Sequence, residues 1–293
     1  MKISKPARIL IAAVLIFLML LSLLPMMMVL INSFKNHVDI VKNPLAIQFT
    51  AGLKNYSKAW ESGNFGRAIL NSVVYTGSTV LITLLVATPC AYVIAFRKVK
   101  ISGLILSYFM MTMTMPCYLF LVPLYRTYAK MGWLGNHVMV SFILAATSLP
   151  LAITLLRTFY VSIPKELEEA ARIDGASEWR TFTDVMFPMI KPGVGALQVI
   201  WHVIFPVLRP GLVTVGIITG LNSWNEFLVS STFLTGEKNF TAMLALMSMN
   251  GPNSANQGIN MAATVTIVAP IILFFILMQR QFIDGMVSGS VKG

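Results

Sequence analysis

The sequence predicts an all-α membrane protein that crosses the bilayer as six helices, within a single domain of residues 1–293. Of these residues 56% are hydrophobic and only 11% are charged, and the mean hydropathy is +0.76. A water-soluble domain of this length needs a more charged surface. Six apolar runs are each near the roughly 20 residues that a helix needs to cross a bilayer. The runs are 9–31, 70–96, 104–124, 138–160, 212–230 and 259–278.

The first apolar run resembles a secretory signal peptide in its flank, because Lys2, Lys5 and Arg8 precede it. It is longer than the apolar part of a signal peptide, and no small-residue cleavage site follows residues 25–28. We therefore expect a retained membrane anchor. In the other runs the prolines are expected to be kinks that neighbouring helices accommodate. These are Pro89, Pro116, Pro150 and Pro270.

The basic residues are unequally divided between the two sides of the predicted spans. With the N-terminus inside, the inner segments hold fourteen of the 22 lysines and arginines and the outer segments hold eight. Cytoplasmic loops carry such an excess. We therefore expect both termini, and the segment between the fourth and fifth runs, in the cytoplasm. The net charge of +11 is spread over short loops, which argues against nucleic-acid binding.

A polar, charge-dense loop, at about residues 161–211, separates the fourth and fifth runs. Pro164 suits the first turn of a short helix, and the glutamates after it suit the positive end of the helix dipole. Gly175 is a natural helix end, and a second helical piece over 178–187 stops at Pro188. Two short helices around a glycine are typical of an element that docks into a groove of another protein.

The spacing of this loop carries a resemblance to a known family. Glu169-Ala170-Ala171 is followed by Gly175 and, after nine residues, by Val185 and Phe187-Pro188. This pattern resembles the EAA loop of the permease subunits of ABC importers. The whole chain is similar to the second permease of carbohydrate importers of the maltose-transporter type. Besides 169–177, the strings that carry this likeness are Asn71-Ser72, Trp224-Asn225-Glu226-Phe227 and 279–293.

The resemblance implies a permease for an oligosaccharide or a related polar sugar, with another polar solute such as a glycerol-phosphate-type compound left open. The implied partners are a second homologous permease, an ATP-binding cassette ATPase dimer and an external solute-binding protein. The implied location is the plasma (inner) membrane of a bacterium or archaeon. The EAA-type helix would transmit ATPase closure to the spans. The residues expected to carry that coupling are Glu169, Ala170, Ala171, Arg172, Asp174 and Gly175.

The sequence contains no motif of a familiar catalytic site. Without a G-x-x-x-x-G-K-[ST] loop, ATP is expected to be bound by a partner subunit, and this chain is expected to need no cofactor. Cys90 and Cys117 lie inside apolar runs, and His37, His137 and His202 are scattered, so neither a disulfide nor a metal site is expected. A membrane-embedded enzyme is therefore the disfavoured alternative from another class.

Glu226 is an acidic residue inside a predicted span, toward the outer half of the fifth run. An ionisable group at such a depth is a candidate functional residue. Trp224, Asn225 and Glu226 are therefore candidates for the substrate path or a gate, with Trp224 offering a flat face to a sugar ring. The alternative is that Asn225 and Glu226 satisfy polar groups at a helix contact. Hydroxyl side chains such as Thr147 and Ser148 suit either close packing or a polar path.

Two segments leave their roles open. Residues 185–193 are echoed at 203–211, an offset of 18 residues, whereas the family pattern has one such element. The echo is either a passive insertion or a lengthened coupling region, and the twelve apolar residues 194–205 are too few to cross a membrane. The outer loop 35–67 is either a surface-lying segment or a contact for an external binding protein.

Overall fold

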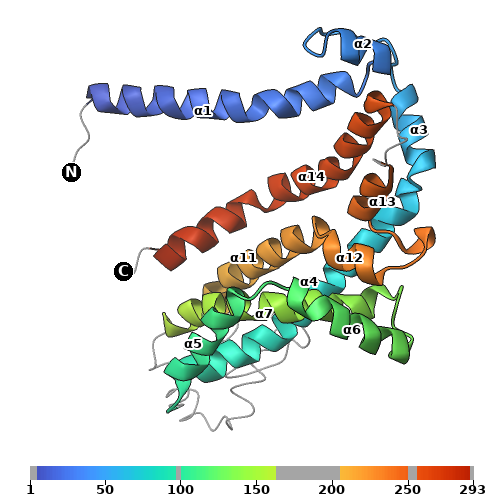
Figure 1. Cartoon of the computed structure of the whole chain (residues 1–293). Helices are drawn as coiled ribbons and strands as arrows, with labels where there is room; N and C mark the ends of the chain where they lie inside the picture. Colours follow the sequence, from blue (N-terminus) through green and yellow to red (C-terminus); the bar gives the residue numbers. More distant parts are fainter. Residues whose placement is uncertain (1–4, 97–99, 163–204, 250–255, 291–293) are drawn as a thin grey trace, which may run out of the picture. The chain divides into compact units, whose positions relative to one another are not determined.

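The computed structural model describes residues 5–96, 100–162, 205–249 and 256–290, and these form helices and turns without a strand (Figure 1). They fall into two compact units, one from 1–69 and 242–272 and the other from 70–241 and 273–293. The helices are α1 (Lys5–Asn32), α2 (His37–Lys42), α3 (Lys54–Ser62), α4 (Phe65–Phe96), α5 (Ser102–Met113), α6 (Tyr118–Met131), α7 (His137–Val161), α11 (Phe205–Trp224), α12 (Leu228–Phe233), η2 (Glu237–Asn239), α13 (Ala242–Met249) and α14 (Gln257–Ser290).

Four of the described helices are long and apolar enough to cross a membrane. They span Lys5–Asn32, Phe65–Ala95, His137–Val161 and Gln257–Gln279. These helices cover four of the predicted runs, the first, second, fourth and sixth, which are thereby confirmed as helices of membrane-spanning length. At about 1.5 Å per residue, α1 with its 28 residues is some 42 Å long, more than the hydrocarbon core requires.

The third predicted run is not one helix, because it divides into α5 and α6. Pro116 has no N–H group and disfavours helical geometry at Met115, so the chain turns there. The amides of Thr114 and Met115 bond back only three residues, to the carbonyls of Met111 and Thr112 at 3.1 and 3.2 Å. The expectation that Pro116 only kinks a continuous helix was therefore wrong. Pro89, Pro150 and Pro270 do lie inside helices.

The fifth predicted run also divides. The helix α11 begins at Phe205, before the expected start, and ends at Trp224, and α12 begins at Leu228. Residues 225–227 separate the two helices, so the expectation of one helix over 212–230 was wrong. Glu226 lies in this break.

The first unit joins the end of α1 to α3 and to the start of α14. The buried Asn55 of α3 donates two hydrogen bonds, to the carbonyls of Ser33 and Lys35, both at 2.8 Å. A Cβ at Gly258, near the start of α14, would lie 2.5 Å from the Lys35 carbonyl oxygen. Glycine is therefore required there by the close approach of two backbones.

In the second unit, α7 is the central helix and packs against α5, α11 and α12. The C-terminal half of α7 contributes Leu156 and Phe159 to a buried cluster with Tyr92 of α4. Its N-terminal half contributes Val140 to a second cluster with Phe233 of α12. The positions of these helices are therefore set by apolar packing along both halves of α7.

Residues 205–211 of the second copy of the repeated segment form the start of α11. Within it, Gly211 lies against the ring of Phe159, and a Cβ added there would be 2.6 Å from the Phe159 Cδ2 atom. The ring is buried, so it has little room to move. This glycine therefore allows α11 to approach α7. The first copy, 185–193, lies outside the described residues.

Replacing Gly211 by alanine should lower the melting temperature of the protein purified in detergent. The added methyl group overpacks the contact with Phe159, which costs about 1–3 kcal/mol of unfolding free energy. The matched control is Gly77→Ala on α4, where an added Cβ meets nothing within 4 Å. The control should leave the melting temperature unchanged or slightly raise it, because alanine favours a helix. Equal melting temperatures for the two variants would contradict this packing.

The repeat provides a second test of the same contact. Deleting residues 194–211 joins Gly193 to Leu212, so that a glycine again precedes Leu212. We expect the shortened chain to insert into the membrane and to keep its melting temperature. A loss of inserted protein would show that the second copy has a role that the first cannot replace.

Candidate functional site

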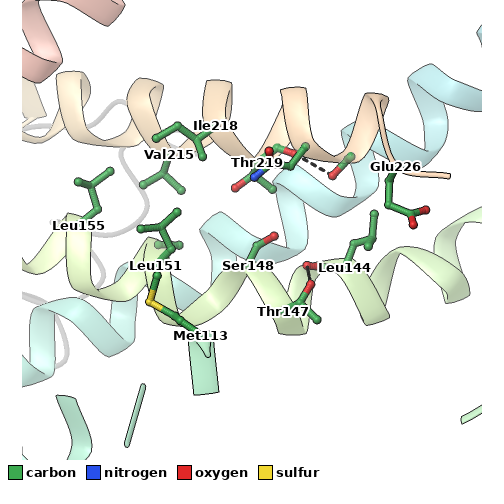
Figure 2. A pocket seen from close by; sticks show the side chains of 13 residues that line it. Met113, Leu144, Thr147, Ser148, Leu151, Leu155, Val215, Ile218, Thr219 and Glu226 are labelled. Atoms are coloured by element: carbon green, nitrogen blue, oxygen red, sulfur yellow. Dashed lines mark hydrogen bonds between the residues drawn. The ribbon is translucent and has the colours of Figure 1, made fainter. Parts of the chain in front are cut away.

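A cavity of about 250 Å³ lies between α7 and α11, and Met113 at the end of α5 contributes to its wall (Figure 2). All of its lining residues belong to the second unit. The lining residues are Met113, Leu144, Thr147, Ser148, Leu151, Ala152, Leu155, Val215, Ile218, Thr219, Asn222, Ser223 and Glu226.

The wall of the cavity changes from aliphatic to polar along its length. Figure 2 shows Leu151, Leu155 and Val215 at one end and Thr147 and Glu226 toward the other. The aliphatic end offers dispersion contacts but no hydrogen bonds. A ligand that has both apolar faces and hydrogen-bonding groups would therefore fit this wall better than a purely apolar one.

Two hydroxyl groups of the lining already use their protons within their own helices. Thr147 Oγ1 donates to the carbonyl of Leu144 at 2.9 Å, and Ser223 Oγ donates to the carbonyl of Thr219 at 2.8 Å. A hydroxyl that donates in this way still has lone pairs that can accept. At these positions the cavity therefore offers acceptors, which suit the hydroxyl donors of a ligand.

Glu226 holds the start of α12. Its Oε1 atom accepts a hydrogen bond from the Val229 amide at 2.6 Å, and its Oε2 atom accepts one from the Ser230 amide at 2.9 Å. These amides lie in the first turn of α12, where N–H groups have no partner within the helix. A carboxylate is also favoured there by the helix dipole. One side chain therefore satisfies two of the backbone amides that the break between α11 and α12 leaves without helical partners.

The same carboxylate lies close to Tyr75 of α4. The Tyr75 side chain is completely buried, and Glu226 is the carboxylate beside its hydroxyl group. Tyr75 also packs in the apolar cluster that contains Phe233 of α12. Glu226 therefore lines the cavity, bonds to the start of α12 and lies beside Tyr75 of α4.

The structure separates the three candidates at 224–226. Trp224 is the last residue of α11 and is half-buried, and its indole N–H is buried without a partner among the described residues. Asn225 is exposed, and its amide donates to the carbonyl of Leu221 at 2.9 Å. Neither lines the cavity, whereas Glu226 does. Their proposed role in a substrate path or gate stays a prediction.

The residues predicted to form the coupling element, Glu169, Ala170, Ala171, Arg172, Asp174 and Gly175, lie outside the described residues, as does the rest of the loop from 163 to 204. In the described part of the chain, no group of three or more His, Cys, Asp or Glu side chains is placed to hold a metal ion. Cys90 and Cys117 are both free thiols.

The sequence also contains a signal for the cavity in the spacing of polar residues along the fifth apolar run. The lining residues Val215, Thr219 and Asn222 of α11, and Glu226 just after it, follow one another at intervals of three or four. This is the spacing of one helix face. Polar residues on one face of an apolar helix indicate a wall that does not touch lipid, which would have singled out Thr219 and Asn222.

Comparison with known proteins gives the family. Residues 86–196 match the family described as binding-protein-dependent transport system inner membrane component. The chain is 32% identical to the melibiose/raffinose/stachyose import permease protein MelC of Bacillus subtilis, over 82% of this chain and 80% of that protein. It is 30% identical to the diacetylchitobiose uptake system permease protein NgcG of Streptomyces coelicolor, over 96% and 87%.

A solved structure agrees with this fold. A chain of a bacterial ABC transporter involved in the import of the acidic polysaccharide alginate superposes with a TM-score of 0.73 at 20% identity, covering 96% of this chain and 99% of that chain. The proteins matched by sequence are transport permeases rather than enzymes. The chain therefore belongs to the family of binding-protein-dependent transport inner membrane components and is a permease subunit of an ABC importer.

Proposed function

We propose that this permease imports an oligosaccharide or a related polar carbohydrate, and that the cavity between α7 and α11 is part of its path. The observation that carries the proposal is the composition of the cavity wall, where aliphatic side chains stand beside hydroxyl, amide and carboxylate groups. A sugar ring has apolar C–H faces and a rim of hydroxyls, so it matches such a wall. The sugars named for the relatives support the same substrate class.

A glycerol-phosphate-type solute is the weaker alternative. A phosphate group is normally bound by arginine, lysine or helix N-terminal amides. None of the thirteen cavity-lining residues is cationic, and the charged residue among them is Glu226. The amides at the start of α12 are already taken by that carboxylate. An uncharged carbohydrate is therefore the substrate that this cavity favours.

The proposed topology is six spans, with both termini in the cytoplasm of a bacterium or archaeon and the protein in its plasma (inner) membrane. The four long helices supply four spans. The pairs α5–α6 and α11–α12 would supply the other two as discontinuous spans. Broken helices are tolerated at membrane depth where the backbone is buried in protein or lines a cavity. The supporting evidence for orientation is the inner excess of basic residues.

The proposed assembly contains this chain, a second homologous permease, an ATPase dimer that binds the ATP, and an external solute-binding protein. In this proposal Glu169, Ala170, Ala171 and Gly175 form the contact with the ATPase, with Arg172 and Asp174 at its rim. The alanines would allow close approach and the glycine would permit the turn. Closure of the ATPases would then move the spans as rigid bodies between two states.

Purification of the tagged chain from its native membrane tests the proposed assembly. We expect an ATPase and a second permease to copurify, and ATP-dependent uptake of labelled oligosaccharide in proteoliposomes when the binding protein is added. The proposed turn would place Gly175 at positive φ, so Gly175→Val should keep insertion but reduce uptake by about tenfold or more, because a β-branched residue resists that conformation. Recovery of the chain alone, or normal uptake by the Gly175 variant, would contradict the corresponding part of the proposal.

Glu226→Gln tests the role of the carboxylate as a gate. Glutamine has one acceptor oxygen where glutamate has two, so one of the two bonds to α12 is lost and an N–H is left facing an N–H. The loss of this cap should cost about 1–2 kcal/mol. We expect lower uptake together with ATPase activity that no longer requires the binding protein.

The matched control is Glu61→Gln, since Glu61 lies on the exposed face of α3. This control should retain the properties of the wild type in both assays. If Glu226→Gln retains them as well, Glu226 has no function in transport.

A further inference from the structure

The loop that follows α12 is held to two helices by their side chains. This loop, residues 234–241, connects α12 to α13 and contains the short helix η2. Four consecutive residues at its tip, Thr235 to Lys238, are exposed, whereas Leu234 and Thr241 at its two ends are buried. Such a loop would ordinarily be one of the more mobile parts of a structure.

Asn71 of α4 uses both of its amide protons on this loop. Its Nδ2 atom donates to the carbonyl of Lys238 at 3.0 Å and to the carbonyl of Phe240 at 2.9 Å. Because both partners are carbonyl oxygens, only the nitrogen side of the amide can face them. The arrangement therefore depends on an amide at position 71, and a carboxylate of the same shape would have no proton to donate.

A side chain of α7 holds the Asn239 carbonyl, which lies between those of Lys238 and Phe240 in the chain. The Nε2 atom of His137, at the start of α7, lies 2.9 Å from the Asn239 carbonyl oxygen, and a carbonyl can only accept, so this nitrogen carries the proton. The turn just before α7 adds a backbone bond, from the amide of Gly135 to the carbonyl of Phe233 at 2.8 Å. Three successive carbonyls, 238 to 240, are thus held by two helices that are distant in sequence.

We infer that Asn71 and His137 are positioning residues that make loop 234–241 rigid with α4 and α7. The consequence concerns the cavity, because α7 supplies Leu144, Thr147 and Ser148 to its wall. A displacement of the exposed tip would then move the outer part of α7 rather than the loop alone. The clamp would link the outer surface of the subunit to the wall of the cavity, and this consequence rests on the proposed transport function.

The decisive variant is Asn71→Asp, which keeps the shape of the side chain and removes both donors. Its matched control is Asn64→Asp, which makes the same change of charge at an exposed position. Spin labels would be attached to Glu237→Cys at the loop tip and to Ala146→Cys on an exposed face of α7, with Cys90 and Cys117 replaced by alanine. Pulsed electron-spin resonance then measures the distribution of distances between the two labels in the purified assembled complex.

In the otherwise unchanged complex we expect one narrow distance peak, with the same mean in the nucleotide-free state and after trapping with ATP and vanadate. In Asn71→Asp the population of undocked loop should rise by about tenfold, because two hydrogen bonds are lost, and a second or broad peak should appear. Asn64→Asp should keep the narrow peak. The ATPase activity without binding protein should be unchanged in both, which separates loss of the clamp from general misfolding.

Two results would overturn the inference. One is a narrow peak in Asn71→Asp, which would show that the amide does not hold the loop. The other is a change of the mean distance between the two trapped states in the unchanged complex, which would show that the loop and α7 do not move together. Neither measurement requires knowledge of the transported solute, so failure of the proposed substrate would leave the test of the clamp intact.

Discussion

Two hydrogen bonds, from the amides of Val229 and Ser230 to the carboxylate of Glu226, hold the first turn of α12 just after the break that ends α11. In a membrane, each backbone N–H that is left without a partner costs several kcal/mol, so a helix can break there only where other groups satisfy it. Glu226 satisfies two such N–H groups with one side chain. The break in turn lets α12 leave the direction of α11 and pack Phe233 against α6 and α7.

The same residue also belongs to the proposed transport path. The carboxylate that caps α12 lines the cavity, so one side chain both bonds to the start of α12 and forms part of the cavity wall. A change at the cavity that altered the bonds of Glu226 would therefore alter the attachment of α12. The tight contact of Gly211 with Phe159 keeps α11 and α7 close about one turn beyond Val215 and Leu155, next to the aliphatic end of the cavity.

Much of the fold could be predicted from the sequence, because the runs 9–31, 70–96, 138–160 and 259–278 are apolar over the full length of a span. The breaks could not be predicted from hydropathy. Thr114 to Cys117 and Asn225 to Phe227 lie inside apolar windows that average over them, and Pro116 could have been either a kink or a helix end.

The site was predictable in part. Glu226 was singled out by its depth in a span, but its bonds to the amides three and four residues later depend on a turn that only the packed helices define. Thr219 and Asn222 carried a signal in their spacing on one face of α11. Asn71 was noticed only as part of a resemblance, because the carbonyls that it holds are more than 160 residues away in the sequence.

The most direct test of the account is amide hydrogen exchange, resolved at Val229 and Ser230, in the wild-type protein and in Glu226→Gln. If the carboxylate closes the break, loss of one cap bond should speed exchange at these two amides by about fivefold to thirtyfold, while the amides of α11 before Trp224 keep their rates. Unchanged exchange at Val229 and Ser230 would contradict the account, because it would show that α12 is held without Glu226.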